Sequence, residues 1–392
     1  MSNFRSNRNR FLSIGFTGLF LLIATTAFAD GTEPEDGQPD SGQTLEPIGF
    51  EQLKSADELV GLQQISLNET RLVEYRADGE VRQRFTPPAK RSPQAPQTAT
   101  FTVTYNPSNC PSGTQPWPTA AKTSFRYALD IFEGIVNSRE TIRVDACWLD
   151  LEQGILGAAG ATNYQANFTN ALVNNVWFPN ALANALAQKD VSPGESDITA
   201  QFSANTNWYF GTDGAVSPSQ YDFATVVLHE VAHGLGFSGS MQVGTLNGQV
   251  VGRWGFGTGA PFTYDLFVVN GGNQFLIDTS IFPNTSPQLA QQLQSNNLFF
   301  VGSEAFWANG RKGVPLYAPT NWVQGTSYSH LALSYRDTPE SLMVGFLSNG
   351  EANHSFGPVT VGLMNDMGWN EALPVFNYSE LTTKTFMPLA RR

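Results

Sequence analysis

Residues 229–233 read His-Glu-Val-Ala-His, and this spacing restricts the fold more than any other feature of the sequence. Histidines four positions apart lie on one face of a helix, where both imidazoles can bind a single zinc ion and the glutamate between them points at a metal-bound water. Apolar residues precede the motif, and Gly234 and Gly236 follow it. Glycine readily adopts the left-handed conformation that ends a helix. The sequence therefore predicts a buried helix that ends soon after His233, from where the chain can turn away and return with a third ligand.

This segment resembles the metzincin zinc peptidases, whose motif continues His-Glu-x-x-His-x-x-Gly-x-x-His. Gly236 matches the glycine of the family, but the next ligand position falls on Gly239, which has no side chain. The leishmanolysin-like branch departs in the same way, through an insertion before the third histidine. The resemblance covers residues 101–370 and is strong only over 226–237. More loosely, residues 208–214 and 362–369 look like stretches of secreted bacterial proteins with this motif.

Two histidines remain as candidates for the third ligand, His330 and His354. His330 is followed thirteen residues later by Met343 in a Ser-Leu-Met run, which resembles the methionine-containing turn beneath the zinc site of this clan. This order favours His330. His354, with Met364 and Met367 after it, is a rival, and a carboxylate such as Glu304 or Glu340 is a third option. Met343 as an ordinary core residue is the alternative reading of the turn.

The motif and the resemblance together imply a zinc-dependent endopeptidase. Zn²⁺ would be held by His229, His233 and His330, and Glu230 would activate the zinc-bound water as base and then acid. Tyr328, next to the third ligand, either donates to the oxyanion or simply packs. Two other functions stay open: an extracellular binding protein with a structural zinc site and no turnover, and a zinc hydrolase acting on a non-peptide amide.

The N-terminus predicts export. Arginines, an apolar stretch and Ala-Phe-Ala at 27–29 form a signal peptide over residues 1–29. No later window offers 18 consecutive apolar residues, so we expect no membrane anchor and a protein secreted to the exterior or the periplasm. In such a compartment the two cysteines, Cys110 and Cys147, favour a disulfide over a thiol that blocks the metal site of a precursor.

Composition divides the rest of the chain. Residues 30–97 combine an acidic stretch, an apolar-periodic stretch and a Pro-rich linker with a Lys90-Arg91 pair that suits a processing protease. They are predicted to be the pro-segment of a zymogen, although an extension that stays attached is the alternative. The zinc peptidase domain then spans 98–392, with an N-terminal subdomain at 98–237, an insertion at 238–326 and a C-terminal subdomain at 327–392.

Periodicity within this domain predicts an α+β fold with a twisted mixed sheet. Strands are expected at 101–105, 142–148 and 197–204, a helix between the first two, and a hairpin and short helix inside the insertion. A half-exposed strand at 198–203 could bind an extended polypeptide substrate through its main chain, or be an ordinary edge strand. The net charge of -12 argues against a nucleic-acid partner, and we expect a monomer.

Overall fold

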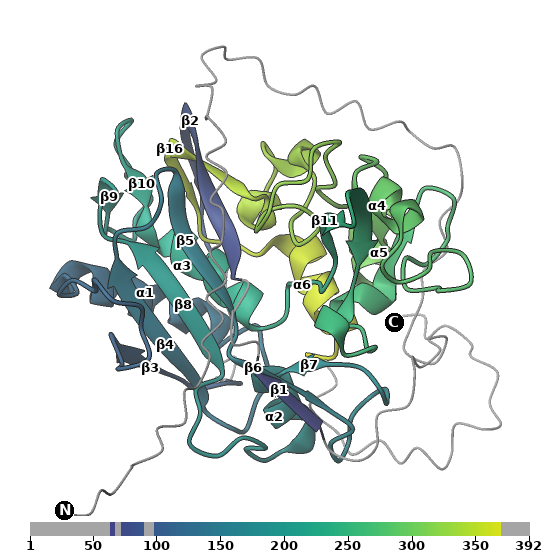
Figure 1. The fold of residues 1–392 in the computed structure, drawn as a ribbon. Coiled ribbons are helices and arrows are strands. Elements are labelled where there is room, and N and C mark those ends of the chain that lie inside the picture. Colours follow the sequence, from purple (N-terminus) through teal and green to yellow (C-terminus); the bar gives the residue numbers. More distant parts are fainter. Residues whose placement is uncertain (1–62, 67–71, 90–97, 370–392) are drawn as a thin grey trace, which may run out of the picture. The chain divides into compact units, whose positions relative to one another are not determined.

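A six-stranded mixed sheet is the framework of the protein, in a computed structural model that describes residues 63–66, 72–89 and 98–369 (Figure 1). Its strand order is β16-β2-β5-β8-β4-β3. β2 runs antiparallel to β5 and β5 runs antiparallel to β8, whereas the other neighbouring pairs are parallel. The bounds are β2 Val73–Thr86, β3 Phe101–Tyr105, β4 Ile142–Leu149, β5 Ile155–Ala161, β8 Ile198–Ser203 and β16 Phe346–Asn353. The predicted α+β class is confirmed.

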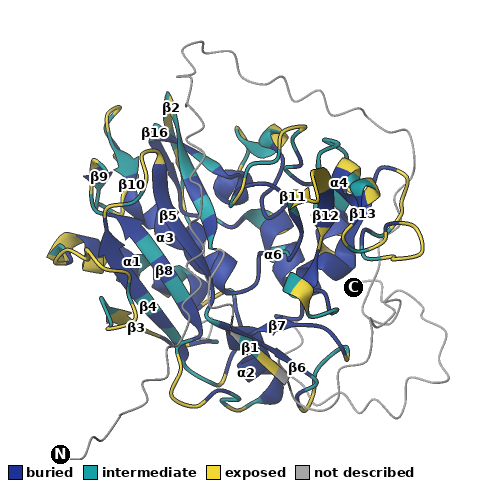
Figure 2. Ribbon diagram, in the orientation of Figure 1, coloured by how far each residue is buried: buried dark blue, intermediate teal, exposed yellow. Residues whose placement is uncertain are grey.

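Two helices, α1 (Thr119–Phe132) and α3 (Phe223–Gly234), pack against each other and α3 packs on the sheet. α1 buries Ala121, Phe125, Ala128, Leu129 and Phe132 along one face, as the apolar periodicity of the sequence predicts. The helix ends before Ile135 and Val136, to which the same periodicity extends. α3 is buried along its whole length, as Figure 2 shows. Aromatic rings gather around its first residue, Phe223, which lies against Trp117, Trp148 and Phe202. Truncating one such ring to alanine costs about 3–5 kcal/mol of stability, so the start of the motif helix is firmly fixed.

The remaining elements are short. Four smaller sheets contain β1 (Gln63–Ser66), β6 (Asn163–Ala166), β7 (Phe178–Pro179), β9 (Trp208–Tyr209), β10 (Tyr221–Asp222), β11 (Gln242–Leu246), β12 (Gln249–Arg253), β13 (Val268–Asn270), β14 (Leu298–Phe300) and β15 (Val314–Pro315). The helices are α2 (Asn180–Ala187), α4 (Pro287–Leu293), α5 (Ser303–Ala308) and α6 (Gly357–Asp366). α4 confirms the short helix expected in the insertion. The expected hairpin is only partly formed: β13 turns back to a single bridge at Phe275 and pairs along its length with β14 instead.

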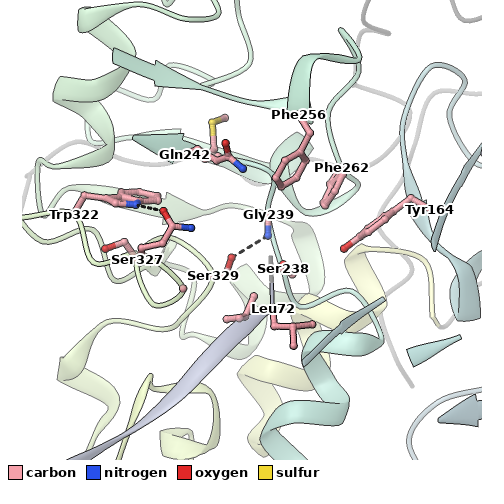
Figure 3. Close-up of a pocket in the computed structure, with 14 residues that line it drawn as sticks. Leu72, Tyr164, Ser238, Gly239, Gln242, Phe256, Phe262, Trp322, Ser327 and Ser329 are labelled. Atoms are coloured by element: carbon pink, nitrogen blue, oxygen red, sulfur yellow. Dashed lines mark hydrogen bonds between the residues drawn. The ribbon is translucent and has the colours of Figure 1, made fainter. Parts of the chain in front are cut away.

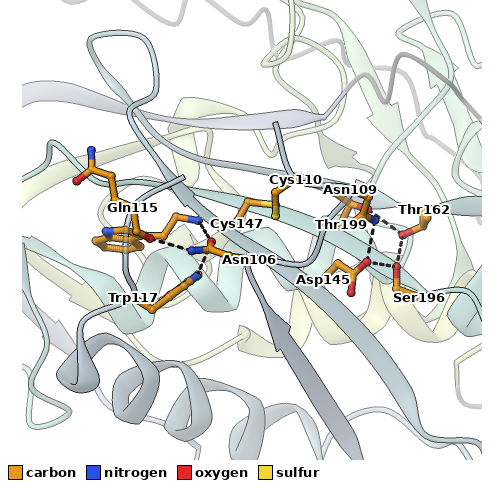
Figure 4. Close-up of a disulfide and its surroundings, with 11 residues drawn as sticks. Asn106, Asn109, Cys110, Gln115, Trp117, Asp145, Cys147, Thr162, Ser196 and Thr199 are labelled. Atoms are coloured by element: carbon orange, nitrogen blue, oxygen red, sulfur yellow. Dashed lines mark hydrogen bonds between the residues drawn. A yellow bond between two sulfur atoms is a disulfide. The ribbon is translucent and has the colours of Figure 1, made fainter. Parts of the chain in front are cut away.

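Cys110 and Cys147 form the predicted disulfide, shown in Figure 4. It joins the loop after β3 to β4, across a sequence separation of 37 residues. Closing a loop of this length stabilises the fold by about 4 kcal/mol in the chain-entropy model. Because both sulfurs are bonded to each other, neither is a free thiol that could block a metal site.

Part of the predicted pro-segment belongs to the sheets. β1 pairs with β6, and β2 lies between β5 and β16 (Figure 1). Cleavage of the chain near residue 97 stays a prediction. The predicted signal peptide at 1–29, the acidic stretch, Lys90-Arg91 and the chain after residue 369 lie outside the described residues.

One expectation about the sheet is wrong. The strand at 198–203 is β8, and it is paired on both sides, with β4 and β5. Its main chain therefore has no free edge for a substrate. Successive residues of a strand point to opposite faces of the sheet, so the alternation shows that one face of β8 is more buried than the other. It does not show whether the edges of the strand are paired. No helix among the described residues is long and apolar enough to cross a membrane.

Candidate metal centre

The two motif histidines project from α3, and the helix is capped at its start. Asp222 accepts a hydrogen bond from the backbone amide of Thr225 at 2.8 Å, which satisfies one of the amides left free at a helix N-terminus. After the second histidine the chain leaves the helix at Gly236, whose φ of 113° is in the range that glycine favours. A Cβ atom there would also meet Pro179 at 2.8 Å. The sequence prediction that this glycine turns the chain away is therefore confirmed.

His330 joins the motif pair, although it lies 97 residues beyond His233. The Nε2 atoms of His229 and His233 are 2.9 Å apart, and the Nε2 atom of His330 lies 3.1 Å from the first and 3.3 Å from the second. Zinc ligands at about 2.0–2.1 Å in tetrahedral geometry lie about 3.3 Å from one another. Among the described residues, these three histidines are the group of side chains that could hold a metal ion.

Backbone carbonyls fix which nitrogen of each ring carries hydrogen. The Nδ1 atoms of His229, His233 and His330 each lie 2.6 Å from a carbonyl oxygen, those of Leu342, Phe237 and Thr326 respectively. A carbonyl only accepts, so each Nδ1–H must donate and each Nε2 presents a lone pair. Three lone pairs that point at one another repel unless a cation lies between them. The donor set therefore fits a divalent ion held by neutral imidazoles, with the outer nitrogens fixed by hydrogen bonds.

Burial determines the protonation of these rings. All three are fully buried, and the loss of solvation lowers the pKa of His229 and His233 well below the usual histidine value and that of His330 to about 4. The neighbouring imidazoles lower the pKa of His229 further, whereas the carbonyl acceptors work in the opposite direction. The rings are therefore neutral at pH 7, which is the form that binds metal.

Glu230, the residue after His229 in α3, lies in a space opened by a glycine. Its carboxylate is fully buried and makes no hydrogen bond with the described part of the chain. A Cβ atom at Gly157 of β5 would lie 2.8 Å from one of its oxygens. Burial raises the pKa of Glu230 well above the usual range, the charge of Glu74 adds to this rise, and the nearby backbone amide of Tyr75 opposes it. An unpaired buried carboxylate is costly for the fold and is typical of functional sites.

The rival ligands lie elsewhere. His354 is buried, but its Nε2 atom lies 2.7 Å from Asp222 at the opposite end of α3, and its Nδ1 atom lies 3.1 Å from the hydroxyl of Tyr127. Glu340 accepts a hydrogen bond from Val359 at the start of α6. Glu304 is on the short helix α5. None of the three belongs to the histidine cluster.

The Ser-Leu-Met run forms a 3₁₀ turn, Ser341–Met343, close to the site. Met343 is fully buried, and Leu342 supplies the carbonyl that holds His229. The backbone oxygen of Met343 accepts from the amide of Leu331, directly after the third histidine. The backbone of this turn thus contacts both the side chain of His229 and the residue that follows His330.

Gly239 lies at the position where the motif that includes Gly236 would continue with a third histidine, and its neighbours leave no room for a side chain there. A Cβ atom at Gly239 would lie 2.0 Å from the ring of Tyr328 and 2.7 Å from a carboxylate oxygen of Asp265. Asp265 accepts hydrogen bonds from Ser240, Phe262 and the Tyr328 hydroxyl, the last at 3.0 Å. Burial raises its pKa to about 6, against these hydrogen bonds. The Tyr328 hydroxyl is thus engaged in the insertion, as the packed alternative predicts.

Sequence reasoning did not single out Tyr75, Gly157 or Asp265. Tyr75 lies in β2, inside the predicted pro-segment, and its ring stacks on that of His229 with centroids 3.7 Å apart. Gly157 lies in β5, which has small residues on both faces. The sequence of β5 is as typical of a loop as of a strand. The alternating residues 73–76 could have indicated a strand, but no local signal places that strand beside the motif helix.

Comparison with known proteins gives partial matches. Residues 140–250 match the family model described as SPBPB7E8-like. A stretch of 63 residues is 41% identical to the Schizosaccharomyces pombe protein named Uncharacterized protein PB7E8.01. That stretch covers 16% of this chain and 11% of the yeast protein. The range matched by the family model contains α3 and Gly157 and ends before His330.

Proposed function

We propose that the protein is a secreted zinc-dependent endopeptidase of metzincin type, similar to the leishmanolysin-like branch. One observation carries the proposal: three neutral imidazoles direct their Nε2 lone pairs at one point, and Glu230, the residue after the first of them, has a buried carboxylate with no hydrogen-bond partner among the described residues. A structural zinc site gains nothing from such a carboxylate, because it is normally closed by four protein ligands. Secretion is supported by the disulfide, which persists in oxidising compartments.

The residues present fit Zn²⁺ as the resident metal. Soft thiolates are absent from the described cluster, and imidazole nitrogen is a usual zinc ligand. His229, His233 and His330 would hold the ion, with their orientation fixed by the three carbonyl contacts. When bound, the ion supplies a Lewis acid and a position for the attacking water.

Glu230 moves the proton in this mechanism. It takes a proton from the attacking water as the nucleophile adds to the peptide carbonyl, and passes this proton to the nitrogen of the departing amine. Burial alone would keep this carboxyl protonated. A nearby divalent charge opposes that effect and favours the ionised base. Gly157 has no side chain that would displace the carboxylate. Neither carboxylate oxygen has a competing hydrogen-bond partner among the described residues.

Glu230→Gln tests the proposal, because the amide preserves the shape and removes the base. We expect the variant to bind zinc as the parent does and to lose at least about 100-fold of its hydrolysis of a denatured protein substrate, in line with general acid-base contributions. A chelator should abolish the parent's activity, and added zinc should restore it. A variant that still cleaves at the parent's rate would contradict the role of Glu230 as the base. A parent that binds zinc but hydrolyses no peptide in its processed form would favour a binding protein with a structural metal.

A further inference from the structure

The first residues of β2 lie along the candidate site. Val73 and Tyr75 pair with Ala159 and Gly157 of β5, in antiparallel register. Gly157 is the residue that faces Glu230. β5 is therefore the strand next to the catalytic carboxylate, and its outer edge is already occupied by another segment of the same chain.

Both edges of this short segment are bound through the main chain. On the side away from β5, the amide of Glu74 donates to the oxygen of Gly325 at 2.9 Å, and the amide of Arg76 donates to the oxygen of Gly345 at 3.1 Å. These two acceptors flank the segment that carries His330. Residues 73–76 thus lie extended between β5 and the loop of the third ligand. Main-chain pairing of this kind binds extended peptides with little dependence on their sequence.

Tyr75 covers the histidine cluster. Its ring lies within 4° of parallel to that of His229, at 3.7 Å between centroids, and only 1% of the residue is exposed. The three histidines and Glu230 are fully buried. Among the described residues, the group that could hold a metal ion contains only the three histidines. The segment 73–76 therefore contributes no member of that group and closes the site by packing over it. A polypeptide substrate cannot reach these groups while Tyr75 is in place.

A pocket continues from the same segment. Leu72 forms part of its wall, across from Phe256 and Trp322 (Figure 3), and Val73 and Met241 also line it. Other wall residues are Ser238 and Gly239, five and six residues after His233, and Ser327 and Ser329, which lie just before His330 in the chain. The wall thus mixes apolar side chains with serines and glutamines, and it lies next to both the histidine segments and the start of β2. This is the arrangement of a peptide-binding site with a side-chain pocket.

We propose that residues 72–76 occupy the position of an extended polypeptide substrate, and that the site is closed until this strand leaves. The proposal rests on the proposed function and deepens it. It implies that a substrate binds antiparallel to β5 in the place of residues 73–76, and that a substrate side chain next to this stretch enters the pocket. Outside the site, β2 pairs with β16, so release must also break that pairing.

The test uses the full chain with a specific protease site placed between residues 90 and 97. After folding and cutting, the N-terminal piece is separated under non-denaturing conditions, and circular dichroism checks that the rest stays folded. A synthetic peptide of residues 70–80 is then titrated by calorimetry into the cut protein carrying Glu230→Gln, which measures binding without turnover. Hydrolysis of an unrelated peptide is measured in parallel on the uncut and cut parent.

We expect the peptide to bind, and the same peptide with Tyr75→Ala to bind at least tenfold more weakly. A peptide with Glu80→Ala is the matched control and should bind like the parent peptide, because Glu80 pairs with Arg82 away from the site. The cut parent should hydrolyse its substrate at least tenfold faster than the uncut chain, and the peptide should inhibit it competitively.

Other outcomes separate the two proposals. Tyr75-dependent binding without hydrolysis by any form supports the strand as occupant of the site and contradicts the endopeptidase. Hydrolysis that is equal in cut and uncut protein overturns the inference and leaves the endopeptidase standing. The inference is also wrong if the protein unfolds when the strand leaves, or if the Tyr75→Ala and Glu80→Ala peptides bind equally.

Discussion

Gly157 faces Glu230 so closely that a Cβ atom on the glycine would lie 2.8 Å from Glu230 Oε1 and 2.9 Å from its Cγ. A third neighbour, a methyl group of Val226 on α3, lies at 3.0 Å. The strand and the motif helix therefore approach each other at a position where only glycine fits. The location of the proposed catalytic carboxylate depends on a residue without a side chain, 73 positions before it in the chain.

Gly157→Ala should displace Glu230 and leave the histidines in place. We expect processed protein with this variant to bind zinc normally and to lose at least about tenfold of its activity, because a shift of the base of about 1 Å is enough to misalign the proton transfer. The control is Gly244→Ala, since nothing lies within 4 Å of a Cβ atom at that position. Activity measured per bound zinc would show the difference, and equal activity of the two variants would contradict this role of Gly157.

Several elements could be predicted from the sequence, because local periodicity and turn residues determine them. These elements are the motif helix with its C-terminal end, α1, β3, β4, β8 and α4. His330 was favoured over His354 by its order relative to Met343. Neither inference required long-range contacts. The neighbour of β5 could not be predicted in this way, because pairing between 73–76 and 155–159 is decided by tertiary packing.

The positions of Tyr75 and of β8 in the fold could not be predicted from the sequence, for the same reason. An alternating strand can be internal, as β8 is, or exposed, and its sequence does not distinguish the two. A segment that reads as an N-terminal extension can also lie against the centre of the molecule. Such placements depend on residues at least 37 positions away, where one sequence alone carries no signal.

Tyr328→Phe should have little effect on catalysis. The hydroxyl of Tyr328 donates to Asp265 at 3.0 Å, so its removal costs the hydrogen bond to a buried carboxylate, about 1–3 kcal/mol of stability. We expect a lower Tm with a kcat within about threefold of the parent, well short of the effect of losing an oxyanion donor. Tyr335→Phe, whose hydroxyl donates to Asn309 at 2.7 Å, is the control. A loss of 100-fold or more in kcat would assign the Tyr328 hydroxyl to the reaction instead.

Asp366 should make stability depend on pH. It accepts from the amides of Glu304 and Ala305 at 2.8 and 2.9 Å, yet burial raises its pKa from 3.8 to about 7. The folded protein therefore holds this proton more tightly than the unfolded chain, so the contribution of Asp366 to stability falls as pH rises from about 4 to about 7 and is constant above that.

Asp366→Asn should flatten this part of the curve, because the amide does not titrate. Chemical unfolding between pH 4 and pH 8 measures the difference in slope between variant and parent. Asp130→Asn is the control, since the side chain of Asp130 is 61% exposed on α1. The assignment to Asp366 fails if the two variants have the same pH profile.

The zinc content of His330→Ala beside that of His354→Ala tests the central claim most directly. Both histidines are fully buried, so both variants carry a comparable packing defect, and only one loses a proposed ligand. We expect purified His330→Ala to bind zinc at least 100-fold more weakly than the parent, while folded His354→Ala keeps one zinc per chain. A full zinc load in His330→Ala, or loss of zinc in His354→Ala alone, would contradict the three-histidine site.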